Sequence, residues 1–479
     1  MKARIIYLLV PVMIISLAIG VSFIQSEQYY NRVYQHEQPK EERRVPLDNT
    51  QFTTHLPVVS VTTNNQRIPG AVILTPARHI QLSEDGLSEI TVDVTLFDEK
   101  PTTSQALLRV RGNSSRLFEK KSYALSFVDD NSNERALQVF GMEADNNWAL
   151  HGPALDRTLL RNYLAMNLSG ELMPYAPDVR FIELFIDGSY EGVYLMMETV
   201  SKGEGRVDIP TPEPNSPMTS YIVEIDRAEK LEFPLNDFLV DTYRVYPSAT
   251  ELTYPTDQQY SEERFKFVNE DYSKLTKQLY QIPYATEKND YKNWVDDTAF
   301  YDYFIINELF RNVDAGYYST YFYRNLRGKL TPVVWDFNNS LNNYQEVTFD
   351  ETGFSLVEAP LFEQLLIEER FVEGLIDRYH VLRASKLSDD RLKRLIDDSV
   401  DYLGEAVTRN NARWGLYFDL SQYNTDDFLQ PIERNPTSYE SALSQMEDYL
   451  FARSKWLDEH IHVLNQYSHP SRHNFHSIK

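Results

Sequence analysis

Hydrophobic periodicity changes once along this chain, near residue 260, and this change limits the folds open to it. Before residue 260, short runs rich in β-branched and aromatic residues alternate between apolar and polar positions, most regularly at 90–96. A period of two is typical of strands with one buried face. The pattern predicts a β-rich half followed by a mainly helical half. The segments with a helical period are 261–280, 296–311, 361–383, 388–414 and 437–465.

Two local features stand out within the β-rich half. Between residues 156 and 172, several leucines and Tyr163 fall on one helical face, which predicts a single helix among the strands. Further on, two apolar segments flank Asp187-Gly188, a pair that strongly favours a tight hairpin turn. Prolines between 205 and 260 then indicate a boundary between two lobes.

The helical half contains one expected interruption and one expected cap. Residues 317–335 have the composition of two extended segments joined by a turn at Arg327-Gly328. Thr437 and Glu440 have the spacing of a capping box, which predicts the start of the last helix.

The N-terminus has the features of a membrane anchor. Residues 5–24 carry no charged side chain and follow Lys2 and Arg4. This length suits a helix that spans a bilayer, whereas a cleaved signal peptide has a shorter apolar core and a small-residue cleavage site. We therefore expect an uncleaved transmembrane anchor. A cleaved signal peptide and a buried helix are the alternatives. The preceding basic residues place the N-terminus in the cytoplasm and the rest of the chain outside it.

Charge and composition exclude several classes of protein. The chain has 479 residues, with 71 acidic against 47 basic side chains, and a net charge of −24. Such a surface repels polyanions, which argues against general nucleic-acid binding. The chain has no cysteine, so disulfides, thiolate catalysis and cysteine-ligated metal sites are excluded.

The common catalytic signatures are also missing from the sequence. The HExxH, GxSxG, GxxxxGK[ST] and GxGxxG patterns do not occur. Helix-borne zinc hydrolases, nucleophile-elbow hydrolases, P-loop enzymes and simple Rossmann enzymes therefore have no support. Paired-carboxylate glycosidase chemistry stays open, because so many acidic residues supply accidental pairs.

A first polar cluster lies in RVRGNSSRLFEKKSYALSF, between two apolar segments. Gly112, followed by Asn113 and Ser114, can turn tightly and present amides and hydroxyls to an anion, as phosphate-binding loops do. An exposed basic hairpin tip explains the same residues equally well. The basic side chains of this cluster are Arg109, Arg111, Arg116, Lys120 and Lys121.

A second polar cluster follows the helix expected at 296–311. Asp314 precedes an extended segment, and Asp336 ends the apolar run VVW and begins a polar loop that contains Asn338 and Asn339. Carboxylate and amide oxygens suit a hard cation such as Mg²⁺, and a second carboxylate could orient an attacking hydroxyl. The ordinary structural preferences of aspartate also explain both residues, with Asp314 as a helix cap and Asp336 as the first residue of a turn.

Five segments, taken in order, resemble the spore coat protein H (CotH) family of atypical kinases. They are RGNSSRLFEKKSY, LHGPALDRTLLRN, RFIELFIDGSYEGVYLMMETV, YIVEIDR and NELFRNVDAGYYSTYFYRNLRGKLTPVVWDFNNSLNN, which together cover roughly residues 105–345. The resemblance implies an α+β, two-lobed, protein-kinase-like fold. The N-terminal lobe would be rich in strands and the C-terminal lobe mainly helical, after one transmembrane helix.

The resemblance also implies roles for individual residues. Asp314 matches the catalytic aspartate of the family and Asp336 its metal-binding aspartate, with Asn338 as a further metal ligand. Lys121 matches the lysine beside the phosphate loop. Its expected acidic partner is Glu198, with Glu183 and Glu171 as alternatives, and Glu198 is also expected among the metal-site residues. The loop after Asp336 lacks the glycine that family members often carry. The implied cofactor-binding residues are Arg111, Gly112, Asn113, Ser114 and Lys121.

The implied function is transfer of the ATP γ-phosphate, with Mg²⁺ or Mn²⁺, to a Ser or Thr of an extracytoplasmic or cell-surface protein. A catalytically inactive surface-binding module and a cell-surface sugar-active enzyme are the alternatives. The expected organisation is a cytoplasmic end (1–4), an anchor (5–24), a tether (25–54), a β-rich lobe (55–230), a helical lobe (231–467) with its catalytic segment at 307–342, and a flexible tail (468–479).

Overall fold

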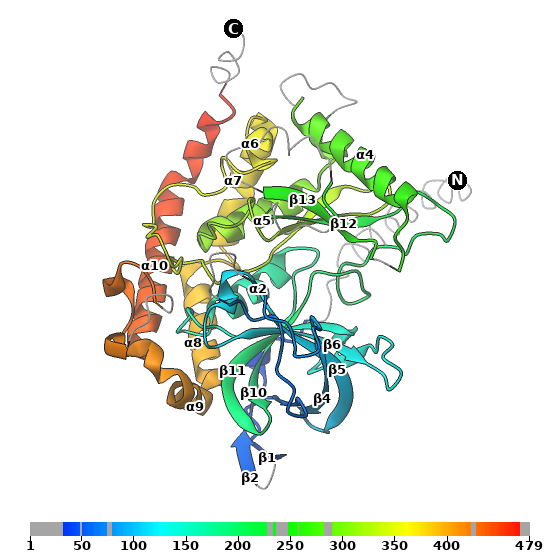
Figure 1. Ribbon diagram of the computed structural model, residues 1–479. Coiled ribbons are helices and arrows are strands. Elements are labelled where there is room, and N and C mark those ends of the chain that lie inside the picture. The colour runs from blue at the N-terminus through cyan, green and yellow to red at the C-terminus, as the bar shows by residue number, and fades with distance from the viewer. Residues whose placement is uncertain are drawn as a thin grey trace, which may run out of the picture. The chain divides into compact units, whose positions relative to one another are not determined.

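The computed structural model describes residues 32–47, 50–73, 79–227, 233–235, 248–256, 258–281, 290–422 and 428–469 (Figure 1). All of the described helices and strands belong to one compact unit that spans Tyr34–Lys479.

Seven strands close into a barrel in the order β10-β11-β9-β6-β5-β4-β3 (Figure 1). Neighbouring strands are antiparallel, except that β10 pairs in parallel with β3 and so closes the barrel. Residues such as Val92, Leu125 and Ile182 form a core within these strands. The barrel strands are β3 (Val58–Thr62), β4 (Ile90–Phe97), β5 (Thr102–Arg111), β6 (Ser122–Val128), β9 (Asn147–His151), β10 (Val179–Ile186) and β11 (Ser189–Glu198).

Two of the local predictions in the β-rich half are confirmed. Along β4, Ile90, Val92, Val94 and Leu96 are buried while their neighbours are more exposed, as the period of two indicates. Between β10 and β11, the Asp187-Gly188 pair forms the turn, with φ angles of 49° and 77°. Both angles lie in the left-handed region that two-residue hairpin turns require.

A second sheet of four strands has the order β13-β12-β14-β15. Its strands are β12 (Tyr221–Arg227), β13 (Ser248–Tyr254), β14 (Thr320–Arg324) and β15 (Leu330–Val333). The helix α4 (Glu262–Leu279) runs alongside β12 and β13 (Figure 1). The turn expected at Arg327-Gly328 joins β14 to β15, as predicted.

The expected helices are largely present. α2 (Arg161–Leu172) contacts both β10 and α5, and it connects the barrel to the second half (Figure 1). The segment expected at 388–414 is broken at Gly404, which has a positive φ and separates α8 from α9. In the described ranges, the other α-helices are α5 (Asp297–Leu309), the short α6 (Phe362–Leu365), α7 (Glu369–Arg383), α8 (Asp389–Leu403), α9 (Glu405–Trp414) and α10 (Tyr439–His460).

The structure corrects the expected fold class. The strands of the first half close into a barrel, and the half expected to be mainly helical contains strands β14 and β15 of the second sheet. A two-lobed kinase-like arrangement, with a β-rich lobe before a mainly helical lobe, was therefore the wrong expectation. The reason is physical: closure depends on parallel pairing of Glu183 with Val58 and its neighbours, and no local pattern encodes so distant a pairing.

The membrane helix of the expected fold class has no counterpart among the described residues. No helix in those ranges is both long enough and apolar enough to span a bilayer. The span expected at 5–24 lies outside the described residues.

Two smaller expectations also differ from the structure. Part of the expected tether is folded, because β1 (Arg43–Leu47) pairs with β2 (Thr50–Thr54) and buries Val45 against Phe185. The cap of α10 is Ser438 with Ser441, rather than Thr437 with Glu440. Another short hairpin, β7 (Leu137–Val139) with β8 (Met142–Asp145), precedes β9.

A buried ion pair ties α10 to α5. The Arg453 Nη2 atom lies 2.6 Å from a Glu308 Oε2 atom, and the two side chains are 0% and 1% exposed. Glu308 also accepts hydrogen bonds from the amides of Ser355 and Leu356, at 2.8 and 2.7 Å. Because both charges are fully removed from water, each depends on the other for compensation.

We expect Arg453→Met to lower the free energy of unfolding by about 3–5 kcal/mol, because it leaves the Glu308 carboxylate buried and unpaired. Urea denaturation followed by circular dichroism measures this loss. The matched control is Lys393→Met on α8, which breaks the exposed pairs with Asp397 and Glu447. The lysine side chain is 46% exposed and the two carboxylates are 57% and 23% exposed. That change should cost no more than about 0.5 kcal/mol. Equal losses in the two variants would contradict the account.

Candidate functional site

A cavity of about 960 Å³ brings the two polar clusters of the sequence together. One side is the β5–β6 connection, with Arg111, Gly112, Asn113 and Ser114. The other side is built by β12, the connection from α5 into β14, and the segment after β15. This second side carries Asp314, Asp336 and Asn338. Residues separated by about 200 positions in the chain therefore face one space.

The basic side of the cavity holds three arginines. Arg109, Arg111 and Arg116 all line the cavity, and no ion pair joins any of them to a carboxylate in the described part of the chain. The Arg111 guanidinium lies over the Trp335 ring, 5.3 Å from its centroid. The Arg116 Nε atom is buried without a hydrogen-bond partner. Burial and the neighbouring arginines lower the pKa of Arg116. This excess of positive charge suits an anionic ligand.

Gly112 shapes the loop on this basic side. Its φ is 102°, and a Cβ atom added there would lie 1.9 Å from the Ser115 Oγ atom. Only glycine fits that position without moving Ser115. The loop then makes a single 3₁₀ turn at Ser114–Arg116 before β6 begins.

On the acidic side, Asp314 and Asp336 follow different elements. Asp314 follows the end of α5, and its Oδ2 atom accepts a hydrogen bond of 2.6 Å from Asn339 Nδ2. Asp336 follows β15 with a φ of 52°, and its Oδ1 atom accepts from the Asn338 amide at 3.1 Å. Burial raises the pKa of each carboxyl group, and the charge of Asp314 raises the pKa of Asp336 further.

A metal ion at this side would need ligands beyond the protein. Within the described ranges, no three carboxylate or imidazole side chains are grouped so that they could hold an ion by themselves. Mg²⁺ in phosphate-binding sites is commonly held by one or two carboxylates together with phosphate and water oxygens. Asp336, with the amide oxygen of Asn338, fits that kind of site, in which the phosphates of a ligand complete the coordination.

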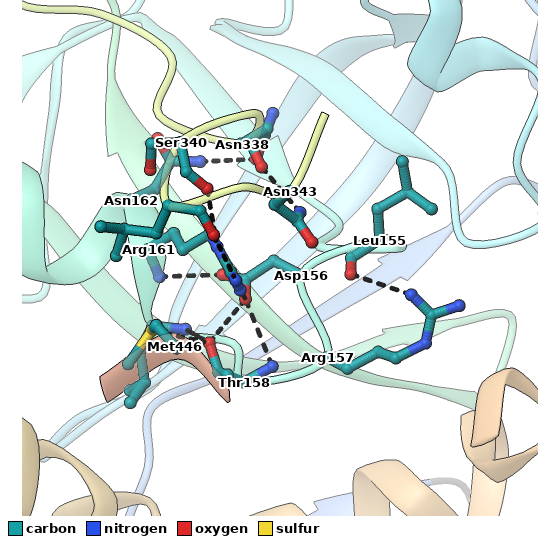
Figure 2. Close-up of polar contacts among 12 residues, drawn as sticks. Leu155, Asp156, Arg157, Thr158, Arg161, Asn162, Asn338, Ser340, Asn343 and Met446 are labelled. Carbon is teal, nitrogen blue, oxygen red and sulfur yellow. Dashed lines mark hydrogen bonds and ion pairs between the residues drawn. The ribbon is translucent and has the colours of Figure 1, made fainter. Parts of the chain in front are cut away.

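Asn162 holds the loop that follows Asp336 (Figure 2). Its Oδ1 atom accepts from the Phe337 amide at 2.8 Å, and its Nδ2 atom donates to Asn338 Oδ1 at 2.7 Å. The preceding residue, Arg161, donates from Nε to the Ser340 carbonyl at 3.0 Å. The first turn of α2 therefore fixes this loop at residues 337, 338 and 340.

A buried ion pair fixes α2 in turn (Figure 2). Asp156 Oδ1 lies 2.6 Å from Arg161 Nη1, and Asp156 Oδ2 accepts from the Arg161 amide at 2.8 Å. Thr158 donates its hydroxyl to the same carboxylate at 2.5 Å. The carboxylate thus caps the helix from outside while it neutralises the arginine.

Three residues that line the cavity were not predicted from the sequence. Glu224 and Asp226 lie two positions apart on β12, so both point to the same side of the strand, while Val223 and Ile225 are buried. The alternation in YIVEIDR is the signal that could have identified them. His151 ends β9, and burial lowers its pKa to about 3, so its ring is neutral at physiological pH.

The structure does not bring two of the predicted residues to the cavity. The Lys121 Nζ atom donates to the Arg116 carbonyl at 2.7 Å and supports the loop from behind, whereas the cavity lining includes neither Lys121 nor Glu198. Glu198 is buried in β11 and accepts from the Asp178 amide at 2.9 Å. The adjacent Lys120 is buried as well, and it donates to the Val193 carbonyl at 2.8 Å.

Comparison with known proteins gives two findings. A family model described as CotH kinase protein matches residues 108–457. The chain is also similar to the inner spore coat protein H of Bacillus subtilis (strain 168), with 32% identity over 92 residues. That stretch is 19% of this chain and 23% of the relative, so the chain spans about a quarter of the length of the relative it matches.

We expect Asn162→Leu to loosen the loop after Asp336 more than it loosens the rest of the protein. The change removes the acceptor of the Phe337 amide, so hydrogen exchange should accelerate in residues 337–341. Global stability should fall by about 1–3 kcal/mol, the scale of two lost buried hydrogen bonds. The control is Asn167→Leu, on the same helix, where the side chain donates to the Tyr163 carbonyl. Faster exchange of the loop in both variants would contradict the assignment.

Glu224 gives a prediction on pH dependence. Burial raises the pKa of Glu224 from 4.5 to about 8. Between these values the unfolded chain releases a proton that the folded protein keeps, so this group lowers stability as the pH rises. Glu224→Gln removes that dependence. The difference in melting temperature, variant minus wild type, should therefore become more positive from pH 5 to pH 8. A difference that stays constant over this range would show that Glu224 ionises normally.

Proposed function

The chain belongs to the CotH kinase protein family, and on that basis we propose that it transfers the γ-phosphoryl group of ATP to a Ser or Thr hydroxyl of a protein. The observation that carries the proposal is the cavity itself. It combines three arginines that have no carboxylate partner in the described ranges with two aspartates on the opposite side.

The basic side supports binding of the triphosphate. Phosphoryl transfer needs positioning and neutralisation of negative charge more than covalent chemistry by the protein. Arg111 and Arg116 would supply charge, and the Gly112 turn would let the backbone of Asn113 and Ser114 approach the phosphates closely. The buried Nε atom of Arg116 would gain an acceptor on binding.

Asp336 and Asn338 would hold Mg²⁺ or Mn²⁺ through oxygen atoms. The cation would supply charge neutralisation at the phosphates. The hydrogen bond from Asn162 keeps Asn338 in place, and the Asn338 amide fixes one oxygen of Asp336. The loop therefore offers its remaining oxygen atoms in a fixed position, even though it contains no glycine.

Asp314 would act on the acceptor hydroxyl. The hydrogen bond from Asn339 orients one of its oxygens, which leaves the other for a substrate. Burial raises the pKa of Asp314, which makes the carboxylate a better proton acceptor than an exposed aspartate. The proton of the Ser or Thr hydroxyl would pass to this oxygen as the phosphoryl group arrives.

A location in the cell envelope or the spore coat fits the relative, which is named an inner spore coat protein. The protein partner would be a substrate that presents Ser or Thr side chains. The net charge of −24 gives no support to a nucleic-acid partner.

The two aspartates should respond differently to substitution. Asp336→Ala removes the charged ligand of the cation, so Mg²⁺-dependent ATP binding and turnover should fall together. Asp314→Asn should bind Mg²⁺-ATP nearly as tightly as the wild type, while phosphoryl transfer falls by about 10²-fold or more. Calorimetric titration with ATP and a radiolabel transfer assay measure the two effects, with melting curves as folding controls.

Equal loss of nucleotide binding in both variants would contradict the separate roles. Tight ATP binding by the wild type without transfer to any protein, itself included, would instead identify an inactive nucleotide-binding module.

A further inference from the structure

A second pocket, of about 440 Å³, lies against the loop that follows Asp336. The loop contributes Leu341, Asn342 and Asn343 to this pocket, whereas its earlier residues line the cavity described above. Among the described residues, only Leu155 lines both spaces. The volume is within the range of sites for small molecules. The proposed transfer of a phosphoryl group makes no use of this second pocket.

The wall and the rim of the pocket carry opposite charges. In the wall, Arg157 and Arg161 are buried, at 5% and 6% exposure, and Arg161 is paired with Asp156. At the rim, Asp448 is exposed and Glu351 is partly exposed. A ligand that enters the pocket therefore passes carboxylates at the rim and meets guanidinium groups in the wall.

Arg434 also lines the pocket, and in the described part of the chain it hydrogen-bonds only to neutral groups. Its Nη2 atom donates to the carbonyl and the Oδ1 atom of Asn342, at 2.6 and 3.1 Å. Its Nη1 atom donates to the carbonyls of Gln430 and Val347, at 2.5 and 3.2 Å. The Nε atom is buried without a hydrogen-bond partner. Burial lowers the pKa of Arg434, as expected of a cation that no nearby anion stabilises.

These features define the chemistry of a suitable ligand. An acidic group beside Arg434 would supply the missing negative charge. The same acidic group would be repelled at the rim, where Glu351 and Asp448 instead need hydrogen-bond donors. Hydroxyl groups can donate to those carboxylates and can also accept from the exposed amide of Gln445. The ligand should therefore have an acidic group at one end and several hydroxyl groups at the other.

We propose that this pocket binds a small polyhydroxylated anion, a sugar acid or a sugar phosphate, with its acidic group near Arg434 and its hydroxyl groups towards Glu351 and Asp448. This inference does not require ATP, so it goes beyond the proposed function. Because Arg434 also holds two oxygen atoms of Asn342, a ligand that fixes Arg434 would stiffen the loop that carries Asp336.

Calorimetric titration of the full chain with glucose 6-phosphate and with gluconate tests the proposal. At least one of them should bind about 10-fold or more tightly than glucose, which lacks the acidic group, and hexanoate, which lacks the hydroxyl groups. That ratio is the scale of one charge-assisted hydrogen bond. The tighter of the two anions shows whether the pocket takes a phosphate or a carboxylate. Binding of none of these compounds, or equal binding of all four, would overturn the proposal.

Substitutions in the lining locate the bound anion. Arg434→Met should weaken binding of the tighter anion by about 10-fold or more. Gln445 lies at the exposed rim, so its substitution should leave the fold intact. Gln445→Glu should weaken binding and Gln445→Lys should strengthen it, each by roughly 3- to 10-fold, the scale of one added charge near a protein surface. Equal affinities in these two variants would contradict the site, even if Arg434→Met fails to fold.

The matched control is Arg116→Met, because Arg116 lines the main cavity and not this pocket. It should leave the affinity for the anion unchanged. The bound anion should also slow hydrogen exchange at residues 341–343. Loss of binding in Arg116→Met, or no slowing at these residues, would place the anion elsewhere and overturn the inference. If the wild type binds the anion but not ATP, the inference stands and the proposed function fails.

Discussion

The buried pair of Asp156 and Arg161 is the interaction on which the rest of the site depends. The pair fixes the first turn of α2 next to the loop that carries Asp336. The Asp156 carboxylate accepts hydrogen bonds from the Arg161 guanidinium, the Arg161 amide and the Thr158 hydroxyl. A pair removed from water in this way is costly to break, because either partner alone would remain charged and buried. Asn162 is the next residue after Arg161 in the same helical turn. The ion pair therefore also holds Asn162 in the position from which it makes two hydrogen bonds to the loop. Asp336 can then keep a positive φ that an unsupported loop would not hold.

The cavity contains basic and acidic side chains that are left for a ligand to neutralise. Basic and acidic residues face one another, yet among the described ion pairs none joins Arg109, Arg111 or Arg116 to Asp314 or Asp336. In the function we propose, a triphosphate with its cation would satisfy both sides at once, since the phosphates would meet the arginines and the cation would meet the carboxylates. The neutral Glu224 differs from these groups, because it adds hydrogen-bonding capacity without adding charge.

Local signals in the sequence were sufficient for local structure and for part of the site. The alternation along β4, the Asp187-Gly188 turn and the helical periods predicted their elements, because each depends on neighbours in the chain. Closure of the barrel depends on pairing between β10 and β3, and β12 meets β14 only after folding, so neither was predictable from period alone. Asp314 and Asp336 were conspicuous in the sequence because each begins a polar segment after an apolar helix or strand, and their roles stay predictions. Lys121 does not line the cavity, because the β5–β6 connection places its Nζ atom on the Arg116 carbonyl, a contact that no local pattern predicts.

The central claim is that one cavity holds Mg²⁺-ATP between the arginines of the β5–β6 connection and the loop held by Asn162. The most direct measurement is a crystal structure with a non-hydrolysable ATP analogue and Mn²⁺, in which anomalous scattering locates the metal. The account predicts the Mn²⁺ peak beside Asp336, with the phosphates towards Arg111 and Arg116. A peak elsewhere in the protein, or a nucleotide bound outside this cavity, would contradict it.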